Sequence, residues 1–299
     1  MKTFLNKVVV ITGAASGFGK EIALKSAEKG MKLVLADIQI EKLKSLAFHL
    51  KKNGAEIVYS KCDVRITSDI KALSKIALDN FGSINILFNN AGVVSGGQIW
   101  ENSEDDWDWV IGVNVIGNIN CLRIFVPIML ESERKDKNFE SHIINTASIA
   151  GLINTPNMGI YNASKHGVIS ISETLYHDLS LLNSNIGVSV LCPFYINTNL
   201  YKSELVRPEK FKLNEIKTKS QEIFKFMLEK AITSSKVSSA DVVDLTFKSI
   251  KEKSFYIFSH QNSFDTIRER FVSILSNTNP VDPYMKVPHI REKLINDLK

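Results

Sequence analysis

Residues Val8 to Gly19 read V-V-V-I-T-G-A-A-S-G-F-G, a short apolar run followed by a glycine-rich turn. The run has the length of a buried strand, and the segment after the turn is helical in its pattern. Glycines in such a turn let the backbone approach a pyrophosphate, which binds at the N-terminus of the helix. The stretch therefore predicts a nucleotide-binding turn, although its T-G-x-x-x-G-x-G spacing differs from G-x-G-x-x-G. A plain turn without a ligand is the alternative that this stretch alone leaves open.

Strand-length and helix-length segments continue to alternate along the chain. Strands are expected at 8–11, 32–36, 56–60, 84–88, 142–145, 187–191 and 255–258, and helices at 17–29, 40–52, 68–81, 105–130, 158–182, 240–250 and 263–275. The strands lack polar alternation, which indicates burial on both faces of a parallel sheet. The pattern predicts an α/β fold, a doubly wound parallel sheet flanked by helices with right-handed crossovers. We expect a single domain over 1–277 and a C-terminal tail over 278–299.

Two segments interrupt this alternation. The stretch 197–236 is long, polar and basic, and we expect it to form a helical substrate flap over a site. Its apolar anchors are predicted to be Phe211, Phe224, Phe226 and Met227. The tail after Asn277 carries three prolines, which predicts an irregular segment followed by a short terminal helix.

Composition limits the classes of function. The chain has 299 residues, 44% hydrophobic and 23% charged, and its net charge of +5 comes from interspersed basic and acidic residues. No clustered basic face is present, so nucleic acid is not an expected partner. No apolar run approaches the roughly 20 residues of a membrane span. The widely spaced cysteines, with no Cys/His cluster, predict reduced thiols in a cytoplasmic protein and no metal site; they are Cys62, Cys121 and Cys192.

An acidic residue follows the second expected strand. Asp37 stands about where a carboxylate would bind the ribose hydroxyls of an adenosine. It would repel a ribose 2′-phosphate, and the neighbouring turn and Ile38 offer no compensating base. These residues favour NAD over NADP as the cofactor. The alternative is that Asp37 caps the following helix.

A tyrosine and a lysine later in the chain form a candidate acid–base pair. Tyr161 and Lys165 are four apart, so on a helix they lie on one face, one turn from each other. A phenol has an ordinary pKa of about 10, and a nearby ammonium favours the phenolate and lowers that pKa. The pair can therefore act as a general acid–base unit. Taken alone, it can also be a chance pair on an amphipathic helix.

With these residues placed, the chain resembles the short-chain dehydrogenase/reductase (SDR) family in its classical form, over about residues 5–260. Thr12 to Gly19 resembles the family's cofactor turn, and Asp63-Val64 resembles the pair beside the adenine ring. The run Asn89-Asn90-Ala91-Gly92 is similar to the N-N-A-G motif after the fourth strand. The positions of the family's catalytic tetrad are occupied by Asn114, Ser148, Tyr161 and Lys165. The resemblance implies a single Rossmann-like domain.

The resemblance also implies a role for each residue. Tyr161 would be the general acid–base group, and Lys165 would lower its pKa and hold the nicotinamide ribose. Ser148 would form a hydrogen bond with the substrate oxygen, and Asn114 would support a water molecule in a proton relay. The expected cofactor-binding residues are Gly13, Ser16, Gly17, Phe18, Gly19, Asp37, Ile38, Asp63, Val64, Asn90, Ala91, Gly92, Tyr161, Lys165, Pro193, Ile196 and Thr198. One departure is Phe194, which replaces the family's usual glycine after Pro193 and fills space near the cofactor or the substrate.

The expected function is an NAD-dependent oxidoreductase that transfers hydride between the nicotinamide and a hydrophobic secondary alcohol or ketone, such as a steroid-like, terpenoid or acyl compound. An apolar substrate wall is expected from Val93, Val94, Ile149, Leu152, Ile153, Met158, Phe194 and Tyr195. The alternatives are a non-catalytic NAD-binding sensor or interaction protein, and another SDR activity such as 3-oxoacyl reduction or epimerisation.

The resemblance further implies a homodimer or homotetramer that pairs the long helices near 105–130 and 158–182. Some apolar residues of these helices suit either the subunit contact or the internal core. They are Leu122, Phe125, Val126, Leu175 and Leu179.

Overall fold

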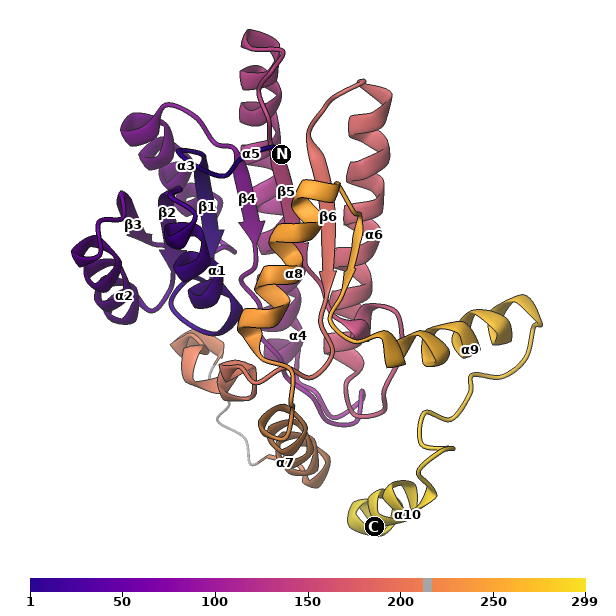
Figure 1. The fold of residues 1–299 in the computed structure, drawn as a ribbon. Helices are drawn as coiled ribbons and strands as arrows, with labels where there is room; N and C mark the ends of the chain where they lie inside the picture. Colours follow the sequence, from indigo (N-terminus) through magenta and orange to yellow (C-terminus); the bar gives the residue numbers. More distant parts are fainter. Residues whose placement is uncertain (212–216) are drawn as a thin grey trace.

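The computed structural model describes residues 1–211 and 217–299, and a parallel sheet is its centre (Figure 1). The strands are β1 Val8–Thr12, β2 Lys32–Asp37, β3 Ile57–Lys61, β4 Ile86–Asn89, β5 His142–Thr146, β6 Gly187–Cys192 and β7 Tyr256–Phe258. They pair in parallel in the order β3-β2-β1-β4-β5-β6-β7. The order reverses between β1 and β4, and ligands of such sheets bind outside the carboxyl ends of the strands at this reversal. The predicted fold class is confirmed.

Helices cover both faces of the sheet, and others lie outside it. The helices of the described residues are α1 Gly17–Glu28, α2 Ile40–Lys52, α3 Thr67–Phe81, α4 Glu104–Ile111, α5 Gly117–Lys135, α6 Gly159–Leu181, α7 Lys219–Thr233, α8 Ser239–Glu252, α9 Phe264–Leu275 and α10 Pro288–Leu298. One core cluster joins α1, α2 and α8 to one face, and a second joins α3, α5 and α6 to the other. In β1, Val9 faces the first cluster and Val10 faces the second. This burial on both sides explains why the central strands read as mainly apolar runs.

The helix expected at 105–130 is longer and contains a wider turn. It runs from Glu104 to Lys135, with a π-helical turn at Gly112–Ile116 between α4 and α5. Its length and composition would suit a membrane span, but half of its apolar window is buried within the fold. Phe125 and Met129 on this helix have no exposed surface, so its hydropathy reflects a core helix.

The residues left open between core and subunit contact divide into two groups. Leu122, Phe125 and Leu179 are buried in the core cluster, whereas Val126 and Leu175 are partly buried and pack against it. Core packing therefore accounts for the first group, and Val126 and Leu175 keep surface on the outer side of their helices.

The flap is built from short helical pieces. Two 3-10 segments, Asn199–Val206 and Glu209–Phe211, precede α7, while 212–216 of the predicted flap lie outside the described residues. Phe211 and Phe224 are buried anchors as expected. The prediction for Phe226 is wrong, because its side chain is 62% exposed. Lys293 of α10 places its Nζ 6.0 Å from the Phe226 ring, so the terminal helix partly covers this face. Figure 1 shows α9 extending away from the sheet before the chain returns to α10.

Candidate active site

The glycine-rich turn after β1 leaves no room for a side chain at Gly13 or Gly19. Gly13 has φ +66°, and a Cβ there would lie 2.9 Å from the Cα of Ala91. A Cβ on Gly19 would lie 2.0 Å from the Gly13 carbonyl oxygen. Ser16 occupies the N-cap of α1 without a side-chain hydrogen bond to the helix. The first backbone N–H groups of α1 therefore have no side-chain partner there, which suits a pyrophosphate.

Thr12 fastens this turn to the loop after β4. Its Oγ1 accepts hydrogen bonds from the backbone N–H groups of Asn90, at 3.0 Å, and Ala91, at 3.1 Å. The Asn90 amide donates in return to the Thr12 carbonyl, at 3.1 Å. The N-N-A-G loop and the turn consequently form one wall of the site.

Asp37 is buried at the end of β2. Its Oδ2 accepts from the Ala15 N–H at 2.9 Å, and its Oδ1 accepts from the Gln39 N–H at 2.8 Å. Burial raises the pKa of the carboxyl group, and these backbone hydrogen bonds oppose that effect. Asp37 thus braces the turn and the start of α2 while its side chain also borders the main cavity. Both roles considered from the sequence, a ribose contact and a backbone brace, are compatible with this position.

Two basic residues at this end of the cavity were missed by the sequence reasoning. Lys42 and Arg65 both line the cavity near Asp37 and Asp63. Arg65 donates from Nε to Asp63 Oδ1 at 2.9 Å, and its guanidinium lies 4.8 Å from the ring of Phe211. Two features of the sequence indicate that these basic residues lie near the site. Lys42 stands in the first turn of the helix after Asp37, and Arg65 follows Asp63 by two residues.

Tyr161 and Lys165 lie one turn apart near the start of α6, and both are buried. The Lys165 ammonium donates to the Thr146 carbonyl at 2.9 Å and lies 5.6 Å from the centre of the Tyr161 ring. Ser148 follows β5, and its hydroxyl donates to the Pro193 carbonyl at 3.3 Å. The helix and the loops after β5 and β6 therefore bring these three side chains to one place.

Burial dominates the acid–base properties of this pair. It raises the pKa of Tyr161 to about 12, although a hydrogen bond with Ser148 lowers it. It lowers the pKa of Lys165 to about 8. The charged form of each group is thus disfavoured, and desolvation, not the Lys165 ammonium, dominates the pKa of Tyr161 in this structure.

Asn114 lies in the π-helical turn, behind the cavity wall. Its Nδ2 donates to the Val93 carbonyl and to the Ser164 hydroxyl, both at 2.9 Å, and its Oδ1 accepts from the Val93 N–H at 2.9 Å. A Cβ on Gly92 would lie 3.5 Å from this oxygen and 3.4 Å from the Lys165 ammonium. Asn114 therefore holds the loop that borders Lys165. π turns within α-helices are frequent at functional sites.

These elements enclose a cavity of about 460 Å³ at the carboxyl ends of the strands. The predicted cofactor residues line it, apart from Gly19, which packs behind the turn. Ser148 also lines it, whereas Asn114 does not. Within residues 1–211 and 217–299, no cluster of three His, Cys, Asp or Glu side chains could hold a metal ion.

The predicted apolar wall is only partly correct. The residues of that wall that border the cavity are Val93, Ile149, Ile153, Met158, Phe194 and Tyr195. Leu152 instead packs in a core cluster beneath the site, and Val94 faces a neighbouring cavity. The structure adds apolar residues from the flap, whose distance along the chain hid them from the sequence reasoning: Leu200, Leu205, Val206, Leu228 and Ile232.

Phe194, at the position of the family's usual glycine, belongs to the cavity wall. Its N–H donates to the Ser259 hydroxyl at 2.9 Å, and its ring lies 4.7 Å from that of Tyr195. The His260 ring lies 5.8 Å away on an adjacent loop. The segment after β7 thus supports the loop that a glycine would otherwise leave free to move.

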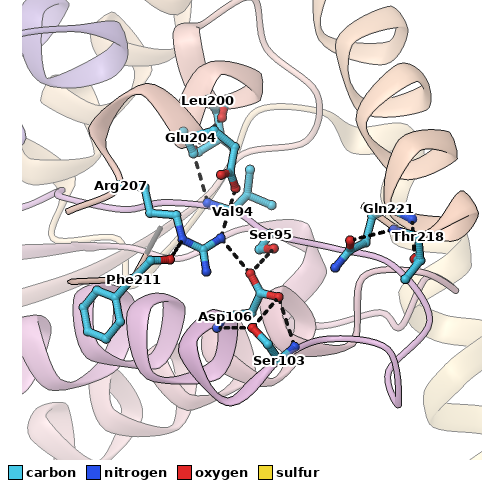
Figure 2. Close-up of polar contacts among 11 residues, drawn as sticks. Val94, Ser95, Ser103, Asp106, Leu200, Glu204, Arg207, Phe211, Thr218 and Gln221 are labelled. Atoms are coloured by element: carbon cyan, nitrogen blue, oxygen red, sulfur yellow. Dashed lines mark hydrogen bonds and ion pairs between the residues drawn. The ribbon is translucent and has the colours of Figure 1, made fainter. Parts of the chain in front are cut away.

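A buried ion pair attaches the flap to α4 (Figure 2). Arg207 Nη1 lies 2.7 Å from Asp106 Oδ1, and both side chains are at most 1% exposed. The guanidinium also donates to the Phe211 carbonyl and lies 4.8 Å from the Trp109 ring. Asp106 accepts from the Ser103 N–H in the capping box of α4. These contacts hold the flap residues Val206 and Pro208 against the cavity.

Residues 7–207 of this chain match the family model of the short chain dehydrogenases. The chain belongs to the short-chain dehydrogenase/reductase family. A family member from Burkholderia phymatum, solved in complex with NAD, shares 46% sequence identity and superposes with a TM-score of 0.92, covering 95% of this chain and 99% of that one.

Other short-chain dehydrogenases match over nearly the full length. The "CLA biosynthesis dehydrogenase/reductase" of Lactiplantibacillus plantarum is 34% identical over 287 residues, which are 94% of this chain and 97% of that protein. A putative short-chain dehydrogenase from Novosphingobium aromaticivorans has 28% identity and a TM-score of 0.76, covering 99% of this chain and 96% of that one. The similarity therefore extends beyond the core sheet to the flap and the C-terminal helices.

Proposed function

We propose that this chain is an NAD-dependent oxidoreductase that transfers hydride between NAD and a hydrophobic secondary alcohol or its ketone. The observation that carries the proposal is one continuous cavity, with the glycine-rich turn and Asp37 at one end and Ser148, Tyr161 and Lys165 at the other. The NAD complex of the 46% identical relative supports the choice of cofactor. The apolar flap and wall support the choice of substrate.

The residues present fit a dinucleotide. The uncapped N-terminus of α1 would hold the pyrophosphate, Asp37 the adenosine ribose, and Lys165 the nicotinamide ribose. The bound nicotinamide supplies the hydride chemistry. In alcohol oxidation, the Ser148 hydroxyl orients the substrate oxygen and the Tyr161 oxygen takes its proton as the carbinol C–H bond breaks. In ketone reduction, Tyr161 returns that proton to the oxygen.

Asp37 is the proposed determinant of NAD preference. Asp37→Asn removes the charge that repels a 2′-phosphate and keeps one oxygen to accept a backbone hydrogen bond. We expect the ratio of the NADP and NAD dissociation constants, measured by calorimetry, to fall about tenfold or more, because one removed charge contact of about 1.4 kcal/mol corresponds to that factor. Asp79→Asn, on the exposed side of α3, is the control and should leave the ratio unchanged. A wild-type preference for NADP would contradict this role.

The pH dependence of alcohol oxidation should change when Lys165 is replaced. Oxidation requires Tyr161 without its proton, so kcat/KM for oxidation should rise with pH up to the pKa of Tyr161 in the complex. The pKa of Lys165 is about 8, so below this pH Lys165→Met removes an ammonium that favours the phenolate, and the rate there should fall as the rise moves to higher pH. Each unit of the shift lowers the rate at a fixed lower pH about tenfold. Lys165→Arg keeps a cation and should restore part of the profile, and an unmoved profile in Lys165→Met would argue against the tuning role.

We further propose a cytoplasmic enzyme that assembles as a homodimer or homotetramer. The three cysteines are free and buried, as expected of a protein from a reducing compartment. Light scattering on the purified protein tests the assembly state.

Calorimetric titration with NAD and NADP, followed by turnover of a panel of secondary alcohols, tests the proposed function. Binding of NAD with formation of NADH supports it. Binding without turnover on any alcohol or ketone would favour the sensor alternative.

A further inference from the structure

A second cavity adjoins the first on the flap side. Its volume is about 300 Å³, and it lies between the loop 94–96, the 3-10 segment Asn199–Val206 and α7. Figure 2 labels four of its lining residues, with Gln221 on α7 apart from Val94, Ser95 and Glu204. The two cavities share lining residues, which are Lys202, Leu205 and Leu228. A ligand that passes these three side chains would occupy both cavities.

The lining of the second cavity carries an excess of positive charge. Lys202, Lys217 and Lys225 border it, and none forms an ion pair with a carboxylate within residues 1–211 and 217–299. Two carboxylates, Glu204 and Glu229, also border it. Glu204 Oε1 lies 3.4 Å from Arg207 Nη1, but the charge of Arg207 is already balanced by the buried Asp106. Among the described lining residues, the cavity thus offers three lysines against two carboxylates.

The floor and the boundary with the main cavity are apolar. Phe224 and Leu228 of α7 are buried, and they pack with Val94 and Tyr201 in one cluster. Leu205 stands at the boundary with 77% of its side chain exposed. An exposed leucine beside a cationic pocket suits a ligand with an apolar chain and an anionic end.

We propose that the second cavity binds the carboxylate of a substrate whose apolar chain crosses Leu205 and Leu228 into the main cavity. The substrate class is then a hydroxy or oxo carboxylic acid with a medium or long chain, and Lys225 and Lys202 are its carboxylate contacts. This inference rests on the proposed dehydrogenase function. The volume is at the lower end of small-molecule pockets, which suits a short charged head and not a nucleotide-bearing thioester.

The test compares acids with their neutral esters. A panel of medium- and long-chain acids with a secondary hydroxyl is oxidised by the full chain with NAD, each beside its methyl ester. Lys202 and Lys225 are exposed. We therefore expect kcat/KM for the acid to exceed that for the ester by about fivefold at most, the upper scale of an exposed ion pair, and to lose this advantage at high salt. Lys225→Gln should bring the ratio toward one. Lys230→Gln, on the same helix but outside both cavities, is the matched control and should preserve the ratio.

The outcomes separate this inference from the proposed function. Equal use of acids and esters, with good turnover of both, would overturn the carboxylate site and leave the dehydrogenase function intact. A ratio that Lys225→Gln does not change would also overturn it. No turnover of any acid, ester or simple secondary alcohol would overturn the proposed function and this inference with it.

Discussion

Tyr161→Phe should lower turnover about 10²–10⁴-fold, the usual contribution of a general acid–base group. The change removes one hydroxyl oxygen from a buried ring on α6 and leaves the ring's packing against Met158 and Leu228 in place. Binding of NAD, measured by calorimetry, should therefore remain near that of the wild type. Turnover is measured as NADH formation with a hydrophobic secondary alcohol at saturating NAD.

Tyr176→Phe is the matched control for this substitution. Tyr176 lies on the same helix, four turns further along, and is 48% exposed, so its loss of a hydroxyl should not affect turnover. Unchanged turnover in Tyr161→Phe would refute the assigned role of Tyr161. Parallel loss of NAD binding and turnover would indicate a disturbed site and not lost proton transfer.

Arg207→Met should lower the free energy of unfolding by about 3–5 kcal/mol, measured by urea denaturation. The substitution leaves the Asp106 carboxylate buried without its cation, at a position with no exposed side-chain surface. An uncompensated buried charge is costly, because neither water nor another cation reaches it. The flap should also loosen, because Arg207 joins α4 to the carbonyl of Phe211.

A surface ion pair provides the comparison. Lys75→Met breaks the pair with Asp79 on α3, where the two side chains are 74% and 56% exposed. Such a pair contributes about 0.3–0.5 kcal/mol, so this variant should unfold close to the wild type. A similarly small effect of Arg207→Met would mean that solvent reaches Asp106 and that the buried pair does not anchor the flap.

Much of the fold is readable from the sequence because its central strands are buried on both faces. These strands appear as mainly apolar runs, and each helix between strands has its own apolar stripe. The edge strand β3 instead alternates between buried and more exposed residues. The glycine-rich turn was recognisable because Gly13 and Gly19 are positions where a Cβ would meet backbone atoms. The pair Tyr161 and Lys165 was recognisable because both lie on one helix at a spacing that fixes their side.

The features that the sequence does not predict depend mainly on contacts between distant segments or on local changes of helix geometry. Arg207 and Asp106 are 101 positions apart, and no local pattern announces their pairing. The π-helical turn that carries Asn114 is a change of one hydrogen-bond register inside a long apolar helix, which periodicity does not resolve. Phe226 was predicted as an anchor from its apolar character alone, but α7 turns that side toward solvent and α10.

The most direct test of the central claim is NADH formation by the purified chain with NAD and hydrophobic secondary alcohols, followed beside NADP under identical conditions. We expect NADH to form with at least one alcohol, and expect the rate with NAD to exceed that with NADP because Asp37 repels a 2′-phosphate. Tight binding of NAD with no NADH from any alcohol, and no NADH consumption with the matching ketones, would contradict the dehydrogenase assignment.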